Sequence, residues 1–109
     1  MSEYIPDKWI IVKMKGKDET LYKVFACWSG NYLHGDSWQM NSGIKAASEA
    51  KDHWLFEGFS GSIYKCRKGS YGLSNYGSSV LMNFINKAKE QKLNVQILED
   101  TDWKLIKYE

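Results

Sequence analysis

The clearest hydrophobic periodicity in the chain lies in residues 78–92. Its apolar side chains recur at a spacing that places them on one face of a helix. They are Val80, Leu81, Phe84, Ile85 and Ala88. Ser78 or Ser79 can cap the first turn, and lysines crowd the second half, where cations interact favourably with the helix dipole. The pattern therefore predicts one amphipathic helix in the C-terminal half of the chain.

Most of the remaining chain is patterned as short strands. Apolar, β-branched or alternating runs predict strands, and turn-forming residues separate them. These runs span residues 9–14, 20–28, 38–40, 53–57, 62–67 and 93–98, and residues 103–108 are expected to form a final strand or an extended tail. Neither face of residues 20–28 is cleanly polar, which predicts a strand that is central in the sheet or is covered on both sides at one end. In residues 44–51 the alanines favour a helical turn, but the position between strands favours a strand and a turn, which we adopt.

The order of these elements predicts the fold class. Several strands precede one helix, one or two strands follow it, and the connections are short. This order indicates an α+β fold, with an antiparallel sheet of five to seven short strands in hairpins or a meander and the helix packed on one face. A length of 109 residues predicts a single domain. Residues 1–7, which contain the chain's single proline, are expected to form a flexible tail.

Composition limits the classes of function without naming one. Hydrophobic residues make up 43% of the chain, so a packed core is expected. No apolar run approaches the length of a membrane span and the N-terminus does not resemble a secretory signal, so a cytoplasmic protein without membrane contact is expected. In that reducing compartment Cys27 and Cys66 are expected to be free thiols. The net charge of +2 is too small to indicate a polyanionic partner.

Two aromatic, glycine-rich segments, residues 32–43 and 68–77, are the candidate binding loops. Aromatic side chains with Ser, Gly and Asn as adaptable polar contacts are typical of binding surfaces, and neighbouring cations could add charge. The candidate residues are Tyr32, Trp38, Asn41, Ser42, Arg67, Lys68, Tyr71 and Tyr76. The alternative is that both segments are ordinary turns of a β-rich domain.

Anions and nucleic acids are weaker candidates as ligands. The second segment leads into the predicted helix N-terminus, which attracts phosphate, but it lacks a phosphate-loop motif. Cations and aromatic residues are interspersed near the second segment, as in proteins that hold single-stranded nucleic acid. The cations are Lys65, Arg67 and Lys68, and the aromatic residues are Phe59, Tyr64, Tyr71 and Tyr76. Arg67 is the chain's single arginine, however, and no RNA-binding aromatic motif is present.

Catalytic and metal-binding patterns are weak. The spacing of Cys27, His34, His53 and Cys66 fits no paired metal-ligand motif, so no metal site and no cofactor are predicted. Cys27 or Cys66 could form a catalytic pair with His34 or His53 only if the fold brings them together. His53 and Cys66 lie on strands that are expected to be adjacent. Nothing marks an orienting group or an oxyanion hole, and no catalytic residue is predicted.

Several short motifs resemble a group of short accessory proteins of large tailed bacteriophages with no known activity. The resemblance rests on residues 6–9, 36–44, 61–66, 68–72 and 99–103, and the alanine-rich residues 44–51 depart from it. It implies a small protein made inside an infected bacterium. We therefore expect a non-enzymatic binding module that engages a host protein or sequesters a small phosphorylated ligand. The alternatives are a single-stranded nucleic-acid-binding protein and a small Cys/His hydrolase.

Overall fold

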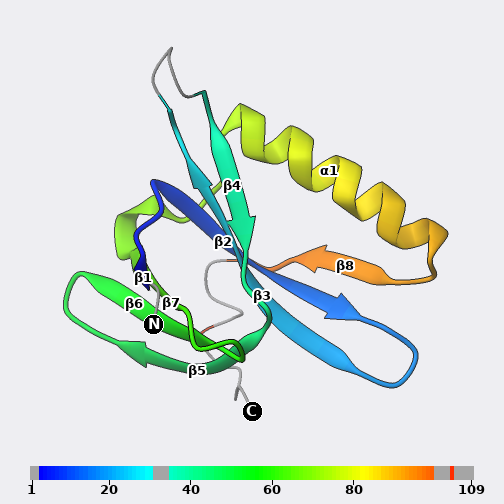
Figure 1. The fold of residues 1–109 in the computed structure, drawn as a ribbon, viewed down its shortest axis with the longest axis horizontal. Helices are drawn as coiled ribbons and strands as arrows, with labels where there is room; N and C mark the ends of the chain where they lie inside the picture. Colours follow the sequence, from blue (N-terminus) through cyan, green and yellow to red (C-terminus); the bar gives the residue numbers. More distant parts are fainter. Residues whose placement is uncertain (1–2, 31–34, 100–103, 105–109) are drawn as a thin grey trace.

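The computed structural model describes residues 3–30, 35–99 and 104. This part of the chain forms eight strands, one short 3₁₀ helix and one α-helix (Figure 1). In chain order they are β1 (Glu3–Tyr4), β2 (Lys8–Lys15), β3 (Thr20–Trp28), β4 (Ser37–Met40), β5 (Ile44–Glu49), β6 (His53–Gly58), β7 (Ile63–Arg67), η1 (Lys68–Ser70), α1 (Asn75–Glu90) and β8 (Asn94–Ile97).

The strands form two four-stranded sheets, with the orders β4-β3-β2-β8 and β1-β7-β6-β5. All neighbours are antiparallel except β1 and β7, which are parallel. The predicted α+β class is therefore confirmed. The sequence predicted neither the division into two sheets nor the additional strand β1. Residues 44–49 form the predicted strand, whereas the final strand or extended tail predicted for residues 103–108 lies, apart from Lys104, outside the described residues.

The molecule has three layers, with the β4-β3-β2-β8 sheet in the middle (Figure 1). One hydrophobic cluster joins this sheet to the second sheet and includes Trp9, Val24 and Phe56. The other joins it to α1 and includes Phe25 and Leu81. Because β2 and β3 are covered on both faces, their buried residues form continuous apolar runs instead of alternating with polar ones. The prediction of a central strand at residues 20–28 is confirmed.

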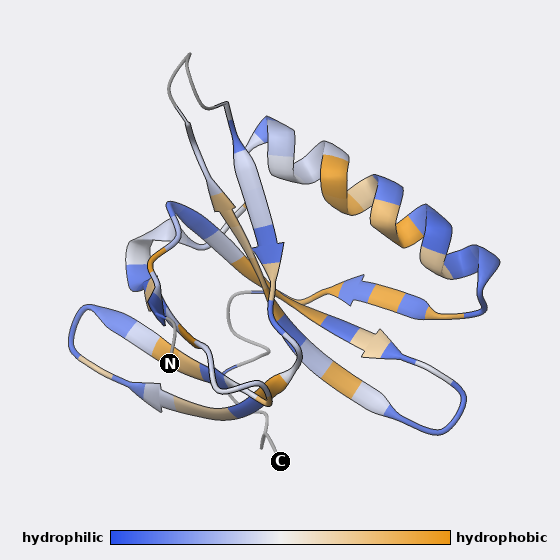
Figure 2. Ribbon diagram, viewed as in Figure 1, coloured by the Kyte–Doolittle hydropathy of each residue, from blue (hydrophilic) through white to orange (hydrophobic). Residues whose placement is uncertain are grey.

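The helix begins three residues earlier than its apolar stripe predicts. Ser74 is the N-cap residue, and its Oγ accepts a hydrogen bond from the Gly77 amide at 3.0 Å, in place of the predicted caps Ser78 or Ser79. Strongly hydrophilic residues gather at the C-terminal end of α1 (Figure 2). There Lys92 adopts a φ of 61°, and the Leu93 amide donates to the Ala88 carbonyl to close the helix.

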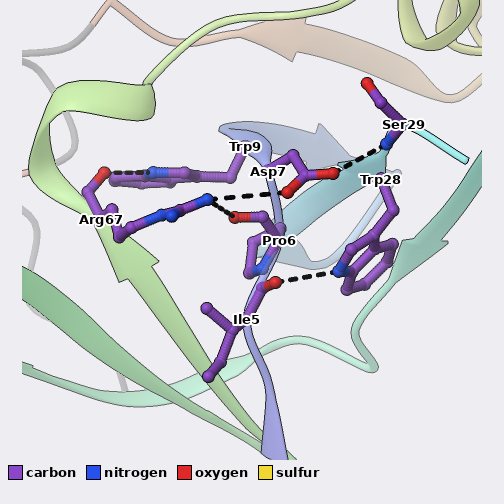
Figure 3. A network of polar contacts seen from close by, with 7 residues as sticks. All are labelled: Ile5, Pro6, Asp7, Trp9, Trp28, Ser29 and Arg67. Carbon is purple, nitrogen blue, oxygen red and sulfur yellow. Dashed lines mark hydrogen bonds and ion pairs between the residues drawn. The ribbon is translucent and has the colours of Figure 1, made fainter.

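Residues 3–7 belong to the folded body, in place of the flexible tail expected for residues 1–7. Glu3 and Tyr4 pair with β7, and Pro6 is fully buried. Trp28 Nε1 donates to the Ile5 carbonyl at 2.9 Å, and the Asp7 carboxylate accepts from the Ser29 amide at 2.8 Å (Figure 3). The segment therefore fastens the edge of one sheet to the end of β3 in the other.

Candidate binding groove

Tyr71, a predicted binding residue, bridges the two layers of the core. Its hydroxyl donates to the Leu98 carbonyl at 2.6 Å and accepts from the Ile11 amide at 3.1 Å. Its ring lies edge-on to Trp9 with centroids 4.8 Å apart, and it packs against both hydrophobic clusters. Both the ring and the hydroxyl of Tyr71 thus contact other parts of the fold. Its position does not support the prediction that it contacts a ligand.

The cations of the second segment are also held by the fold. The Arg67 guanidinium lies 3.4 Å from the Pro6 carbonyl and 3.6 Å from the Asp7 carboxylate (Figure 3). The backbone carbonyl of Arg67 accepts a hydrogen bond from Trp9 Nε1 at 2.7 Å. Lys68 forms an ion pair with Glu49 at 2.6 Å. These contacts direct both side chains toward other parts of the protein rather than toward a shared ligand.

The structure does not assemble the anion site considered at the helix N-terminus. Ser74 already satisfies the Gly77 amide, which is one of the donors that such a site would use. Lys65 alternates along β7 with the buried residues Tyr64 and Cys66, so it lies on the outer face of its sheet. The helix packs on the far side of the middle sheet, so both sheets lie between Lys65 and the helix N-terminus.

Asn41 and Ser42, expected to offer hydrogen bonds to a ligand, hold the chain where it leaves β4. Asn41 is only 5% exposed, and its Oδ1 accepts from the Val24 amide at 3.0 Å, so the side chain replaces a backbone carbonyl in the last rung of the sheet. Its Nδ2 has no hydrogen-bond partner among the described residues. The Ser42 Oγ accepts from the Ser60 amide at 3.0 Å and fastens the β6–β7 turn. The burial of Asn41 therefore does not support the prediction that it contacts a ligand.

Tyr76 and Tyr32, the other two tyrosines predicted to bind a ligand, do not identify a binding site. Tyr76 is half-buried in the first turn of α1. Tyr32 lies outside the described residues. Among the described residues, the two glycine-rich segments therefore do not line one common groove.

Trp38 is the predicted site residue that does line a groove. It lies on β4, is 41% exposed and stacks on Phe25 with centroids 5.5 Å apart and an interplanar angle of 17°. The groove has a volume of about 350 Å³ and lies between β4 and α1. Its lining residues are Lys23, Trp38, Gln39, Met40 and Phe84. This volume is within the range of sites that hold a small molecule or a few side chains of a peptide.

The surroundings of the groove carry few charges. Residues 37–44, which include β4, and residues 71–86, which include most of α1, contain no Asp, Glu, Lys or Arg, although such residues make up 26% of the chain. Lys23 is the one charged side chain among the described lining residues. Met82, on the same uncharged stretch of α1, is 52% exposed. Absence of charge together with exposed Trp and Met is typical of the centres of protein interfaces.

Sequence reasoning missed four lining residues, Lys23, Gln39, Met40 and Phe84. Phe84 and Met40 appeared as parts of regular elements, and nothing in their local pattern distinguished them from core residues. The two uncharged stretches were the available signal, because an exposed strand and an exposed helix face normally carry charged residues. The two uncharged stretches form one surface only because the fold brings β4 beside α1.

The structure does not form the Cys–His pair considered from the sequence. Cys66 pairs in register with Trp54, so the preceding residue His53 projects from the opposite face of the sheet. Cys27 and Cys66 are buried, and burial raises the pKa of both thiols. Each is therefore held as a neutral thiol, which is a poor nucleophile. His34, the other candidate partner, lies outside the described residues.

The described residues contain neither a metal-binding cluster nor a membrane-spanning helix. No cluster of three or more His, Cys, Asp or Glu side chains in residues 3–30, 35–99 and 104 is arranged to hold a metal ion. Within the same residues, no helix is both long enough and apolar enough to cross a membrane. Comparisons with models of protein families, with curated proteins and with solved structures find no match to this chain.

Proposed function

We propose that the protein is a non-enzymatic binding module that engages a partner protein through the groove beside Trp38. One observation carries this proposal: a solvent-exposed tryptophan lies beside a groove on a surface that two uncharged stretches of the chain build together. Tryptophan is enriched among residues that dominate protein-binding energy, particularly where uncharged neighbours exclude water. Following the resemblance to bacteriophage accessory proteins, we propose a protein of the bacterial host as the partner.

A small phosphorylated ligand and a single-stranded nucleic acid are the alternative occupants. Either would require several cations near the groove, and Lys23 is the one cation among its described lining residues. Tyr64, one of the aromatic residues considered for base stacking, is 1% exposed, and burial raises its pKa to about 12. The charge distribution therefore favours a protein partner over either alternative.

A retention experiment tests the proposal. The immobilised full chain is incubated with a bacterial lysate, and retained proteins, nucleic acids and small molecules are identified. Trp38→Ala is compared with Phe59→Ala, because Phe59 is 53% exposed, lies on the β6–β7 turn and is not among the residues that line the groove. We expect a protein that the native chain and Phe59→Ala retain and that Trp38→Ala loses.

The salt dependence of retention separates the partner classes. A contact dominated by aromatic and apolar groups should change less than about threefold between 50 and 300 mM salt, whereas nucleic-acid binding should fall steeply. A retained nucleic acid, or a retained protein that Trp38→Ala still holds, would contradict the proposal. Circular dichroism of each variant shows whether the fold is intact before binding is compared.

A further inference from the structure

The outer edge of β4 carries backbone groups, directly beside the groove, that pair with no other described strand. β4 is an end strand of its sheet, and none of the described strands pairs with its outer side. The Asn41 amide donates to the Val24 carbonyl, which identifies residues 41 and 24 as a hydrogen-bonded pair of the antiparallel ladder. Because such pairs alternate along two antiparallel strands, Gln39 is bonded to β3 whereas Trp38 and Met40 are not. The N–H and C=O groups of Trp38 and Met40 therefore point outward.

The side chains of the same two residues line the groove. In β4, Trp38 and Met40 alternate with Gln39 and share the face that the helix covers, since they lie opposite Cys27 and Phe25 of the helix-side cluster. A strand added at this edge would place two side chains, two residues apart, on that face. Those side chains would enter the space beside Phe84, where the lining is apolar.

β4 has only four residues, but it lacks the charge, proline and bulge that protect many exposed strand edges. Native edges commonly carry lysine, proline or a bulge, which discourage pairing with another chain. β5, an end strand of the other sheet, has Lys45, Glu49 and a register shift between Ile44 and Ala46. β4 reads Ser-Trp-Gln-Met and is paired with β3 without a register shift. The edge of β4 can therefore pair with an added strand, whereas the charges and the register shift of β5 disfavour such pairing.

We infer that the partner contributes an extended peptide segment that adds to the β4-β3-β2-β8 sheet at the outer edge of β4. This inference rests on the proposed function and specifies its binding mode. The segment carries apolar side chains at two alternate positions, which face Trp38, Met40 and Phe84. An acidic residue beyond these positions would complement Lys23, because no carboxylate lines the groove among the described residues. Main-chain pairing supplies the affinity and the alternate side chains supply the specificity.

Peptides selected from a random library test the inference. Linear peptides of about ten residues are selected for binding to the full chain, and their affinities are measured by calorimetry. Each backbone nitrogen of the best peptide is then methylated in turn. Methylation of residues opposite Trp38 and Met40 removes a donor to β4, whereas methylation of the residue between them does not. We expect losses of at least about tenfold at alternate positions and little change between them.

Amide hydrogen exchange of the native chain gives a second readout that needs no substitution in the protein. The Trp38 and Met40 amides should become protected on peptide binding, whereas the Gln39 amide, already bonded to β3, should change little. Peptides that require Trp38 but show neither alternation nor protection would overturn strand addition while leaving the groove as the binding site. Peptides that bind Trp38→Ala as tightly as the native chain would contradict the groove itself.

Two further results would also overturn the inference. Selected peptides that bind as helices would occupy the groove without using the edge, and circular dichroism of the complex would show it. A dimer of the chain in analytical ultracentrifugation that Trp38→Ala disrupts would assign the edge to a second copy rather than to a partner. A selection that yields no binding peptide would likewise overturn strand addition, while the retention experiment would still test the proposed function independently.

Discussion

The two aromatic, glycine-rich segments have similar composition and opposite roles. In residues 68–77, Tyr71 is bonded through its hydroxyl to two backbone groups and packs against both hydrophobic clusters. In residues 37–43, Trp38 contacts Phe25 through one face of its ring and is 41% exposed. Residues 68–77 therefore join the layers of the fold, and residues 37–43 present a surface. The contrast lies in the long-range partners of each aromatic side chain, which local composition does not specify.

The largest expected effect is the loss of stability in Tyr71→Ala. Removing a ring that packs on both clusters should lower the free energy of unfolding by about 3–5 kcal/mol. Tyr71→Phe should cost about 1–3 kcal/mol, because it leaves the buried Ile11 amide without its acceptor. Urea denaturation followed by tryptophan fluorescence measures both changes.

Tyr76→Phe is the matched control, because it makes the same chemical change in the same segment. The Tyr76 hydroxyl forms no hydrogen bond with any of the described residues, so its removal should change stability by less than about 0.5 kcal/mol. If Tyr71→Phe and Tyr76→Phe had equal effects, the hydroxyl bridge would not distinguish the two segments and the comparison would fail.

Gly77→Ala should produce the next largest effect. In an ordinary helix interior this change is stabilising by about 1 kcal/mol. Here an added Cβ would lie 2.4 Å from the Cys27 Sγ, so overpacking should lower stability by about 1–3 kcal/mol instead. Thermal unfolding of the single variants and of the Cys27→Ala/Gly77→Ala pair forms a double-mutant cycle.

The sign of the coupling free energy in that cycle shows whether Gly77 is needed for packing against Cys27 or only for the start of the helix. Cys27→Ala removes the sulfur and leaves its Cβ at 3.6 Å from the added methyl, so the pair should be at least about 1 kcal/mol more stable than additivity predicts. Additive effects would indicate that Gly77 serves only the start of the helix. A favourable coupling would place it among the packing residues that join α1 to β3.

Much of the fold could be predicted because its signals are local. The apolar stripe of α1, the continuous apolar run of β2 and the alternation of β7 depend on neighbouring residues alone. The division into two sheets could not be predicted in the same way. It depends on Asn41, whose side chain takes the place of a backbone carbonyl and ends β4, so that the chain crosses to the other sheet. A buried Asn with this role has the same local sequence as an exposed Asn in a turn.

The candidate site was predicted at one residue and missed at most others for the same reason. Trp38 was identified because a tryptophan among Ser, Gly and Asn is unusual, and that local signal was sufficient. Arg67 and Lys68 were assigned to a ligand because they follow one another in sequence, whereas their contacts lie on the N-terminal segment and on β5. Lys23 and Phe84 are far apart in the chain, so only the packing of α1 against the sheet brings them to one groove.

Trp38→Ala should affect binding more than stability, in contrast to Tyr71→Ala. The variant loses the stacking on Phe25, which should lower the free energy of unfolding by about 1 kcal/mol. Affinity for the selected peptides should fall by at least about thirtyfold, corresponding to a hot-spot residue. Calorimetry at a temperature where both proteins are folded measures the affinity. A loss of stability similar to that of Tyr71→Ala would instead identify Trp38 as a core residue.

The smallest effects should come from substituting Lys68 and Lys23. These two substitutions compare charged side chains of the two regions, as the preceding ones compare aromatic side chains. Lys68→Gln removes an ion pair whose side chains are 36% and 56% exposed, so the stability should change by less than about 0.5 kcal/mol and peptide affinity should not change. Lys23→Gln should also leave stability nearly unchanged, but should weaken peptides that carry an acidic residue by about threefold to fivefold at low salt. The difference should disappear at 500 mM salt, because screening removes an exposed charge interaction and leaves the apolar contact with Trp38. Equal effects of the two substitutions on affinity would mean that the binding surface extends to the second segment, as the sequence first suggested.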